Sequence, residues 1–156
     1  MYTEDSVLKH IAENNIELID LQFTDILGVT KSVTILSSTL EEVFERGLWF
    51  DGSSIYGFAR IQESDMRLKP DAVTYRPLPW ITEAPLRARV ICDILDADGD
   101  PFTGDPRTTL RRAVAKANSM GFDTFNVGPE IEFFLLRKGS NGSVIDAVPN
   151  DIGGYF

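Results

Sequence analysis

The sequence has little cysteine and comparatively few positive charges. Cys92 is the single cysteine, which excludes an internal disulfide framework and favours a reducing compartment. Lysine and arginine number 15 against 24 aspartates and glutamates, giving a formal net charge of -9, so the basic patches that nucleic acids and membrane surfaces require are not expected. No apolar run reaches the roughly 18 residues of a membrane span, and the N-terminus lacks a basic region followed by an apolar one. We therefore expect a cytoplasmic protein that can attract cations.

Short helices and strands alternate through the first hundred residues. Apolar spacing predicts a helix over residues 4–14, and alternation predicts a β-hairpin from strands at 16–23 and 29–35. The Ser38-Thr39-Leu40-Glu41 spacing is typical of a capping box, which would open a short helix that ends before Gly47. Further strands are predicted at 66–69, 73–77 and 87–95, with Cys92 on the buried face of the last. This order indicates an α+β fold.

A second region is predicted to begin near residue 103. Pro101-Phe102-Thr103-Gly104 has the turn residues of a linker, so we place a domain boundary there. Asp105-Pro106 supplies an N-cap and a proline at the first helical position, and apolar spacing continues the helix to Gly121. Its basic residues, Arg107, Arg111, Arg112 and Lys116, are interpreted as a solvated face, with a phosphate site as the less favoured alternative. Only one strand pair follows, so we expect this second domain to be truncated.

Two glutamates stand in an apolar context in Gly128-Pro129-Glu130-Ile131-Glu132-Phe133-Phe134-Leu135-Leu136. In a strand, Glu130 and Glu132 would share one face, about 6.5 Å apart. Both faces are otherwise apolar, which predicts partly buried carboxylates that need cationic partners. Paired carboxylate oxygens suit Mg²⁺ or Mn²⁺. The alternative is a strand end at which the pair simply reaches water.

Two aromatic residues are followed directly by a compact polar cluster in Trp49-Phe50-Asp51-Gly52-Ser53-Ser54-Ile55. Small polar residues at a glycine often do no more than turn the chain. The functional alternative is a contact with a cation or substrate, in which Asp51 is an acceptor or base and the serines donate or accept hydrogen bonds. Composition alone leaves both interpretations open.

Several of these motifs, taken in order, resemble the bacterial-type (class I) glutamine synthetases. The motifs are Asp51-Gly52-Ser53-Ser54-Ile55, Glu63-Ser64-Asp65-Met66, Gly104-Asp105-Pro106-Arg107, Glu130-Ile131-Glu132-Phe133-Phe134, and Pro149-Asn150-Asp151 with Gly153-Gly154-Tyr155-Phe156. The resemblance extends over essentially the whole sequence but covers well under half of the family's usual length. It implies a β-grasp-like N-terminal domain over residues 1–102, followed over 103–156 by the start of the catalytic α/β domain.

The resemblance also implies a reaction and a set of site residues. The family uses ATP to activate the side-chain carboxylate of glutamate as γ-glutamyl phosphate, which ammonia then attacks. Glu130 and Glu132 would be ligands of two different divalent metal ions, Mg²⁺ or Mn²⁺. Asp51 would bind ammonium and help to deprotonate it, with Ser54 nearby. Arg60 resembles, at a single position, an arginine of the feedback-inhibited subtype.

The family's assembly is a double-ring dodecamer in which the N-terminal domain of one subunit completes the neighbour's active site. The later acidic, histidine and arginine motifs of the family are missing here, so we expect the 156-residue chain alone to be inactive. Two alternatives stay open. One is a relative that joins glutamate to a different amine, and the other is a non-catalytic β-grasp module for oligomerisation or regulation.

Overall fold

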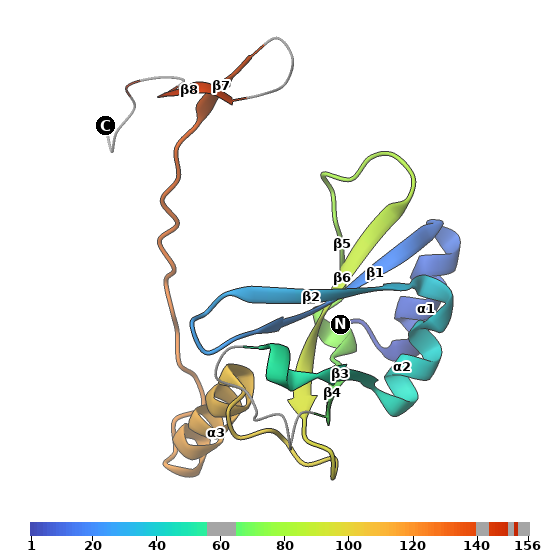
Figure 1. Ribbon diagram of the computed structural model, residues 1–156. Coiled ribbons are helices and arrows are strands. Elements are labelled where there is room, and N and C mark those ends of the chain that lie inside the picture. The colour runs from blue at the N-terminus through green and yellow to red at the C-terminus, as the bar shows by residue number, and fades with distance from the viewer. Residues whose placement is uncertain (56–64, 140–143, 150–151, 153–156) are drawn as a thin grey trace. The chain divides into compact units, whose positions relative to one another are not determined.

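A computed structural model describes residues 1–55, 65–139, 144–149 and 152 of the chain (Figure 1). Contacts divide the chain into two units, Met1–Phe122 and Asp123–Phe156. The described part of the first unit contains, in chain order, α1 (Glu4–Glu13), β1 (Ile16–Thr24), β2 (Thr30–Leu36), η1 (Ser37–Thr39), α2 (Leu40–Arg46), β3 (Leu48–Asp51), η2 (Gly52–Ser54), β4 (Asp65–Pro70), η4 (Ala72–Thr74), β5 (Arg76–Pro77), β6 (Leu86–Leu95) and α3 (Pro106–Ser119).

One mixed sheet organises the first unit, with strand order β2-β1-β6-β4-β3 and with β5 paired to β6. β1 and β6 are parallel, whereas the other pairs are antiparallel. β6 is therefore the central strand. Its side chains alternate as predicted, and Ala88, Val90, Cys92 and Ile94 are all buried.

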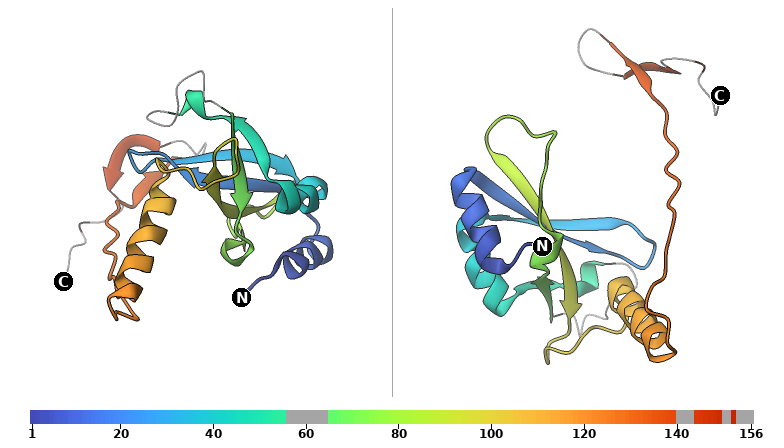
Figure 2. Two further views of the ribbon diagram at one scale, coloured as in Figure 1. Left: turned by 90° about the horizontal axis from the view of Figure 1, so that it is seen from below. Right: turned by 180° about the vertical axis from the view of Figure 1, so that it is seen from behind.

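The core lies where α1 and α2, which lie side by side (Figures 1 and 2), meet the alternate residues of the strands. Val7 and Ile11 of α1 and the α2 residues Leu40, Val43 and Phe44 are buried in the same apolar cluster as the strand residues. The helix over 4–14, the β-hairpin and the short helix ending before Gly47 are thus confirmed. No helix of the described residues is long and apolar enough to cross a membrane.

The predicted capping box at Ser38 is wrong. Residues Ser37–Thr39 form a 3-10 turn in which the Thr39 hydroxyl donates to the Leu36 carbonyl at 2.8 Å, so α2 begins without a side-chain cap. A capping box does occur at α1, between Thr3 and Ser6. The sequence pattern missed it because serine takes the place of the usual glutamate or glutamine.

The strand predicted over 73–77 is also largely wrong. The Asp71 carboxylate accepts the Val73 N–H at 3.2 Å and opens the 3-10 turn η4, which leaves only the two-residue strand β5. The side-chain bond from an aspartate to the backbone two residues on competes with the strand conformation.

The described part of the second unit contains the antiparallel pair β7 (Leu136–Lys138) and β8 (Val144–Pro149). Residues 123–135, drawn as a thin orange-to-red trace in Figure 1, have no helix or strand. The strand predicted over 128–136 is therefore wrong except at its last residue. The physical reason is the lack of a neighbour: among the described residues no second strand pairs with 128–135, and an unpaired strand leaves its backbone groups to water.

Candidate functional site

The candidate site residue Asp51 lies at the end of β3, at the edge of the sheet. Alternation along β3 turns Phe50 toward the core, where its ring lies 5.3 Å from that of Phe23, and turns Trp49 and Asp51 to the opposite face. Trp49 and Asp51 are both exposed. The sheet thus presents the carboxylate to solvent on a rigid strand.

The Asp51 carboxylate is oriented by the residue two positions on. Its Oδ1 accepts hydrogen bonds from the Ser53 backbone N–H at 2.9 Å and from the Ser53 hydroxyl at 2.6 Å. Ser54, the predicted partner, is exposed at the end of η2. Sequence reasoning named both serines as hydrogen-bonding groups but chose Ser54 as the site residue, whereas the bonds to Asp51 come from Ser53. The Asp-x-Ser spacing carried the signal, because an aspartate readily accepts the N–H of the residue two positions later.

Gly52 fixes this turn against the core. Gly52 is buried, and a Cβ at this position would lie 2.5 Å from the Met66 sulfur. Met66 is itself 2% exposed, so its side chain has little room to move. A glycine is thus required for the turn to sit on the sheet at this depth.

The neighbouring strand adds a second carboxylate and a cation. The β3–β4 register places Asp65 opposite Asp51 and Arg67 opposite Trp49. The Arg67 guanidinium lies 4.9 Å from the centre of the Trp49 ring, a favourable cation–π distance. Two like charges opposite each other in a ladder repel, so the Asp51–Asp65 pair concentrates negative charge at this corner of the sheet. Sequence reasoning did not single out Asp65, because only the register brings it to Asp51.

The other predicted carboxylates belong to the second unit. Glu130 and Glu132 are exposed, which contradicts the prediction that they are partly buried. Their oxygens have the chemistry that Mg²⁺ or Mn²⁺ prefers, but two carboxylates do not complete the coordination of either ion. Within the described ranges there is no group of three or more His, Cys, Asp or Glu side chains that could hold a metal ion. Arg60 lies outside the described residues.

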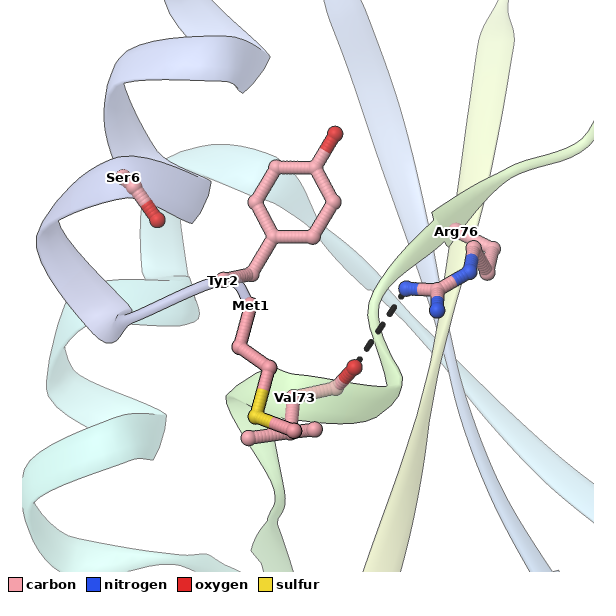
Figure 3. Close-up of a pocket in the computed structure, with 5 residues that line it drawn as sticks. All are labelled: Met1, Tyr2, Ser6, Val73 and Arg76. Carbon is pink, nitrogen blue, oxygen red and sulfur yellow. Dashed lines mark hydrogen bonds between the residues drawn. The ribbon is translucent and has the colours of Figure 1, made fainter.

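A pocket elsewhere in the first unit does not share this chemistry (Figure 3). It is lined by Met1, Tyr2, Ser6, Val73 and Arg76. The Arg76 guanidinium donates to the Val73 carbonyl at 3.3 Å, so its charge is partly engaged by backbone (Figure 3). None of the five lining side chains is a carboxylate, and the pocket therefore does not fit a metal ion or ammonium.

Two protein-family models match the chain in order. The model described as the glutamine synthetase β-grasp domain matches residues 15–97. The model described as the glutamine synthetase catalytic domain matches residues 103–153. The α+β class and the β-grasp architecture predicted from the sequence are thus confirmed. The exact domain boundary stays a prediction, because the contacts group α3 with the first unit.

Curated relatives cover almost the entire chain. A glutamine synthetase of Staphylococcus epidermidis is 47% identical over 155 residues, and one of Methanosarcina mazei is 48% identical over 154 residues. Each alignment covers 99% of this chain and 34% of the relative, so the chain spans about a third of the length of these proteins.

Solved structures are similar in fold. A structure of GmaS in complex with ADP matches with a TM-score of 0.66 and 25% identity, covering 72% of this chain and 25% of that chain. The Plasmodium falciparum glutamine synthetase matches with a TM-score of 0.69 and 22% identity over 78% of this chain and 23% of that chain, a likeness of fold alone.

Proposed function

The chain belongs to the glutamine synthetase family, and from that premise we propose that it supplies the β-grasp domain and the first part of the catalytic domain of a glutamate–ammonia ligase. The observation that carries the proposal is the match of both family models, in order, over a chain that is 47% identical to a glutamine synthetase along 99% of its length. The proposed reaction consumes ATP, forms γ-glutamyl phosphate and transfers the acyl group to ammonia. The cytoplasm is the proposed compartment, because the single cysteine Cys92 favours a reducing environment.

Asp51 is proposed to bind ammonium and to accept its proton. Nitrogen attacks only as neutral ammonia, so a carboxylate that first attracts the cation and then takes a proton serves both needs. The hydrogen bonds from Ser53 and the exposure of Asp51 at the sheet edge support this role. Ser54 is proposed to offer a further hydrogen bond to the nitrogen.

Glu130 and Glu132 are proposed to hold two divalent metal ions together with ligands that the rest of the catalytic domain contributes. A bound Mg²⁺ or Mn²⁺ would neutralise the negative charge that accumulates when ATP meets a carboxylate. Glu130 and Glu132 are exposed and have no third ligand beside them among the described residues, so they would form a metal site only together with ligands from the rest of the catalytic domain. The 156-residue chain alone is accordingly proposed to be inactive.

The proposed assembly is the family's dodecamer, in which Asp51 of one subunit would face the metal ligands of the next. Support comes from the position of Asp51 on an edge strand, where its side chain is exposed and can be approached by a neighbouring subunit. The regulatory role of Arg60 is proposed on its sequence context alone.

A chimeric enzyme tests the proposal. This chain would replace the corresponding third of the Staphylococcus epidermidis glutamine synthetase, and glutamate- and ammonium-dependent ATP hydrolysis would be measured. We expect an active chimera, in which Asp51→Asn and Glu132→Gln each lower kcat about 10²-fold or more. Asp98→Asn, in an exposed turn, is the matched control and should leave turnover unchanged.

The alternatives are outcomes of the same assay. An assembled but inactive chimera would favour the non-catalytic module, and turnover with alkylamines but not with ammonium would favour the related amine ligase. Full ammonium-dependent activity in the Asp51→Asn variant would remove Asp51 from the mechanism.

A further inference from the structure

The boundary between the two family models and the boundary between the two compact units fall at different residues. The family models meet between residues 97 and 103, whereas the first compact unit continues through α3 to Phe122. Sequence reasoning placed the boundary at residue 102 and interpreted the arginines of α3 as a solvated face. That interpretation is wrong for Arg107, whose side chain is only 22% exposed, and incomplete for Arg111, which is 55% exposed but ion-paired. The partners of both arginines explain why α3 belongs to the first unit.

Both arginines pair with the same two aspartates of the first unit. Arg107 contacts Asp71 with Nη2 at 2.5 Å and Asp93 with Nε at 2.9 Å. Arg111 donates from Nε to Asp93 Oδ1 at 3.0 Å and from Nη2 to Asp93 Oδ2 at 2.9 Å, and it contacts Asp71 at 3.2 Å. These four residues form one network, the clamp, in which Arg111 holds Asp93 with two parallel bonds, the strongest arrangement of this ion pair.

Each acidic member of the clamp is held by the sheet. Asp93 lies in the central strand β6, and the Asp71 N–H donates to the Ile91 carbonyl at 2.9 Å. The Asp71, Asp93 and Arg107 side chains are between 22% and 25% exposed, so solvent and salt screen them less than they screen an ordinary surface pair. Hydrogen bonding to Asp93 also raises the pKa of Arg111.

The start of α3 is fixed by more than charge. The Asp105 side chain, which is 1% exposed, accepts the N–H groups of Arg107 at 3.1 Å and Thr108 at 3.0 Å. Just before it, the Phe102 N–H donates to the Ile94 carbonyl at 2.9 Å, and Phe102 contacts the core. Apolar packing contributes little to holding the helix, because its apolar residues Leu110 and Val114 are 62% and 49% exposed.

We propose that the clamp makes α3 a fixed part of the β-grasp unit, and that the joint between this unit and the chain that follows lies at Met120–Asp123 and not at the linker of residues 98–104. α3 ends at Ser119, and Gly121, two residues later, has a φ of 88° and no described atom within 4 Å of the position that a Cβ would take.

Hydrogen exchange on the 156-residue chain tests the inference without any activity assay. In the wild-type chain we expect the amides of the first half of α3 to be protected, and residues 122–135 to exchange at the rate of an unstructured peptide. Arg107→Ala combined with Arg111→Ala should accelerate exchange in α3 by about tenfold or more while the β6 amides keep their protection. Arg112→Ala, an exposed arginine of the same helix, is the matched control and should change neither.

Two further measurements keep the test decisive. If the double variant also loses protection in β6, Asp71→Asn replaces it, because asparagine can still accept the Val73 N–H while losing the charge. Sodium chloride at about 1 M should accelerate amide exchange in wild-type α3 toward the rate of the double variant. The Arg112→Ala variant, which keeps the clamp, should respond to salt as the wild type does. The proposal would be overturned by unchanged α3 protection in the clamp variants or by an equal loss of protection in Arg112→Ala. Limited proteolysis of the wild-type chain gives one more check: cleavage should occur first at residues 120–127, and cleavage first at 98–104 would also overturn the proposal.

Discussion

Strand β6 and the segment of residues 128–136 are both apolar stretches that the sequence predicts as strands, yet only β6 is one throughout. β6 lies between β1 and β4, also pairs with β5, and buries every second residue. In the second segment Ile131, Phe133 and Phe134 are 81%, 73% and 85% exposed. Hydrophobicity is thus no guarantee of a strand. A strand forms when neighbours take its backbone hydrogen bonds and cover one of its faces.

The sharpest test of this difference is a matched pair of isoleucines, buried Ile94 and exposed Ile131. Ile94→Ala removes a fully buried side chain and should cost about 3 kcal/mol of unfolding free energy, whereas Ile131→Ala should cost under about 0.5 kcal/mol. Urea unfolding followed by the fluorescence of Trp49 and Trp80 measures both. A cost for Ile131→Ala similar to that for Ile94→Ala would mean that residues 128–136 are packed in solution.

Two glycines with positive φ, one packed against the sheet and one with open space around it, should also differ in their contribution to stability, by less than the two isoleucines do. Gly47 ends α2 with φ 75°, and a Cβ there would lie 3.0 Å from the Leu68 carbonyl oxygen. Gly121 has φ 88° but no close neighbour among the described atoms. We expect Gly47→Ala to cost about 2 kcal/mol and Gly121→Ala about 1 kcal/mol or less, because only the first adds a backbone clash to the left-handed strain. Thermal unfolding of the two variants should rank them in this order; the reverse ranking would contradict it.

A carboxylate at the turn of the β-hairpin gives a pH-dependent effect confined to the first unit. Burial acts to raise the pKa of Asp25, but bonds from the Val29 and Leu27 N–H groups, together with Lys31, lower the pKa below its ordinary value of 3.8. A lowered folded-state pKa stabilises the fold above the unfolded pKa, and this stabilisation is lost as pH falls through the folded pKa.

Asp25→Asn should therefore be less stable than wild type at neutral pH, and the two should converge below about pH 3. Urea unfolding at a series of pH values measures the convergence. The exposed Asp98→Asn serves as the control, with a flat difference over the same range. A gap between Asp25→Asn and wild type that stays constant down to low pH would show that the Asp25 charge does not hold the turn.

The smallest effect is expected from divalent metal added to the chain alone. Glu130 and Glu132 are exposed and without a third ligand among the described residues, so Mn²⁺ should bind no tighter than about millimolar and should not shift the melting temperature. Calorimetric titration of wild type and of the Glu130→Gln, Glu132→Gln double variant should give the same trace. Saturable micromolar binding that the double variant abolishes would mean that the chain closes a metal site by itself.

Local chemistry was predicted well where a few adjacent residues decide the outcome. Asp105 and Pro106 start α3, Gly47 ends α2, and Cys92 lies on the buried face of β6, where burial raises the pKa of its thiol. The hairpin followed from alternation. The capping box at Ser38 failed because α2 begins at Leu40 with Thr39 as its N-cap residue, and the Thr39 hydroxyl donates to the Leu36 carbonyl instead of accepting from the helix.

By itself, the sequence determined the fold class, the family and the residue types of the candidate site, because periodicity, caps and motif order are properties of neighbouring residues. Only the tertiary structure decided which partners those residues meet. The β3–β4 register brings Asp65 opposite Asp51, and β6 carries Asp93 to Arg111 across 18 positions of the chain. Glu130 and Glu132 show what happens when those tertiary partners are missing among the described residues. Their strand pattern is encoded locally, but burial and metal ligation depend on neighbours that the described residues do not supply.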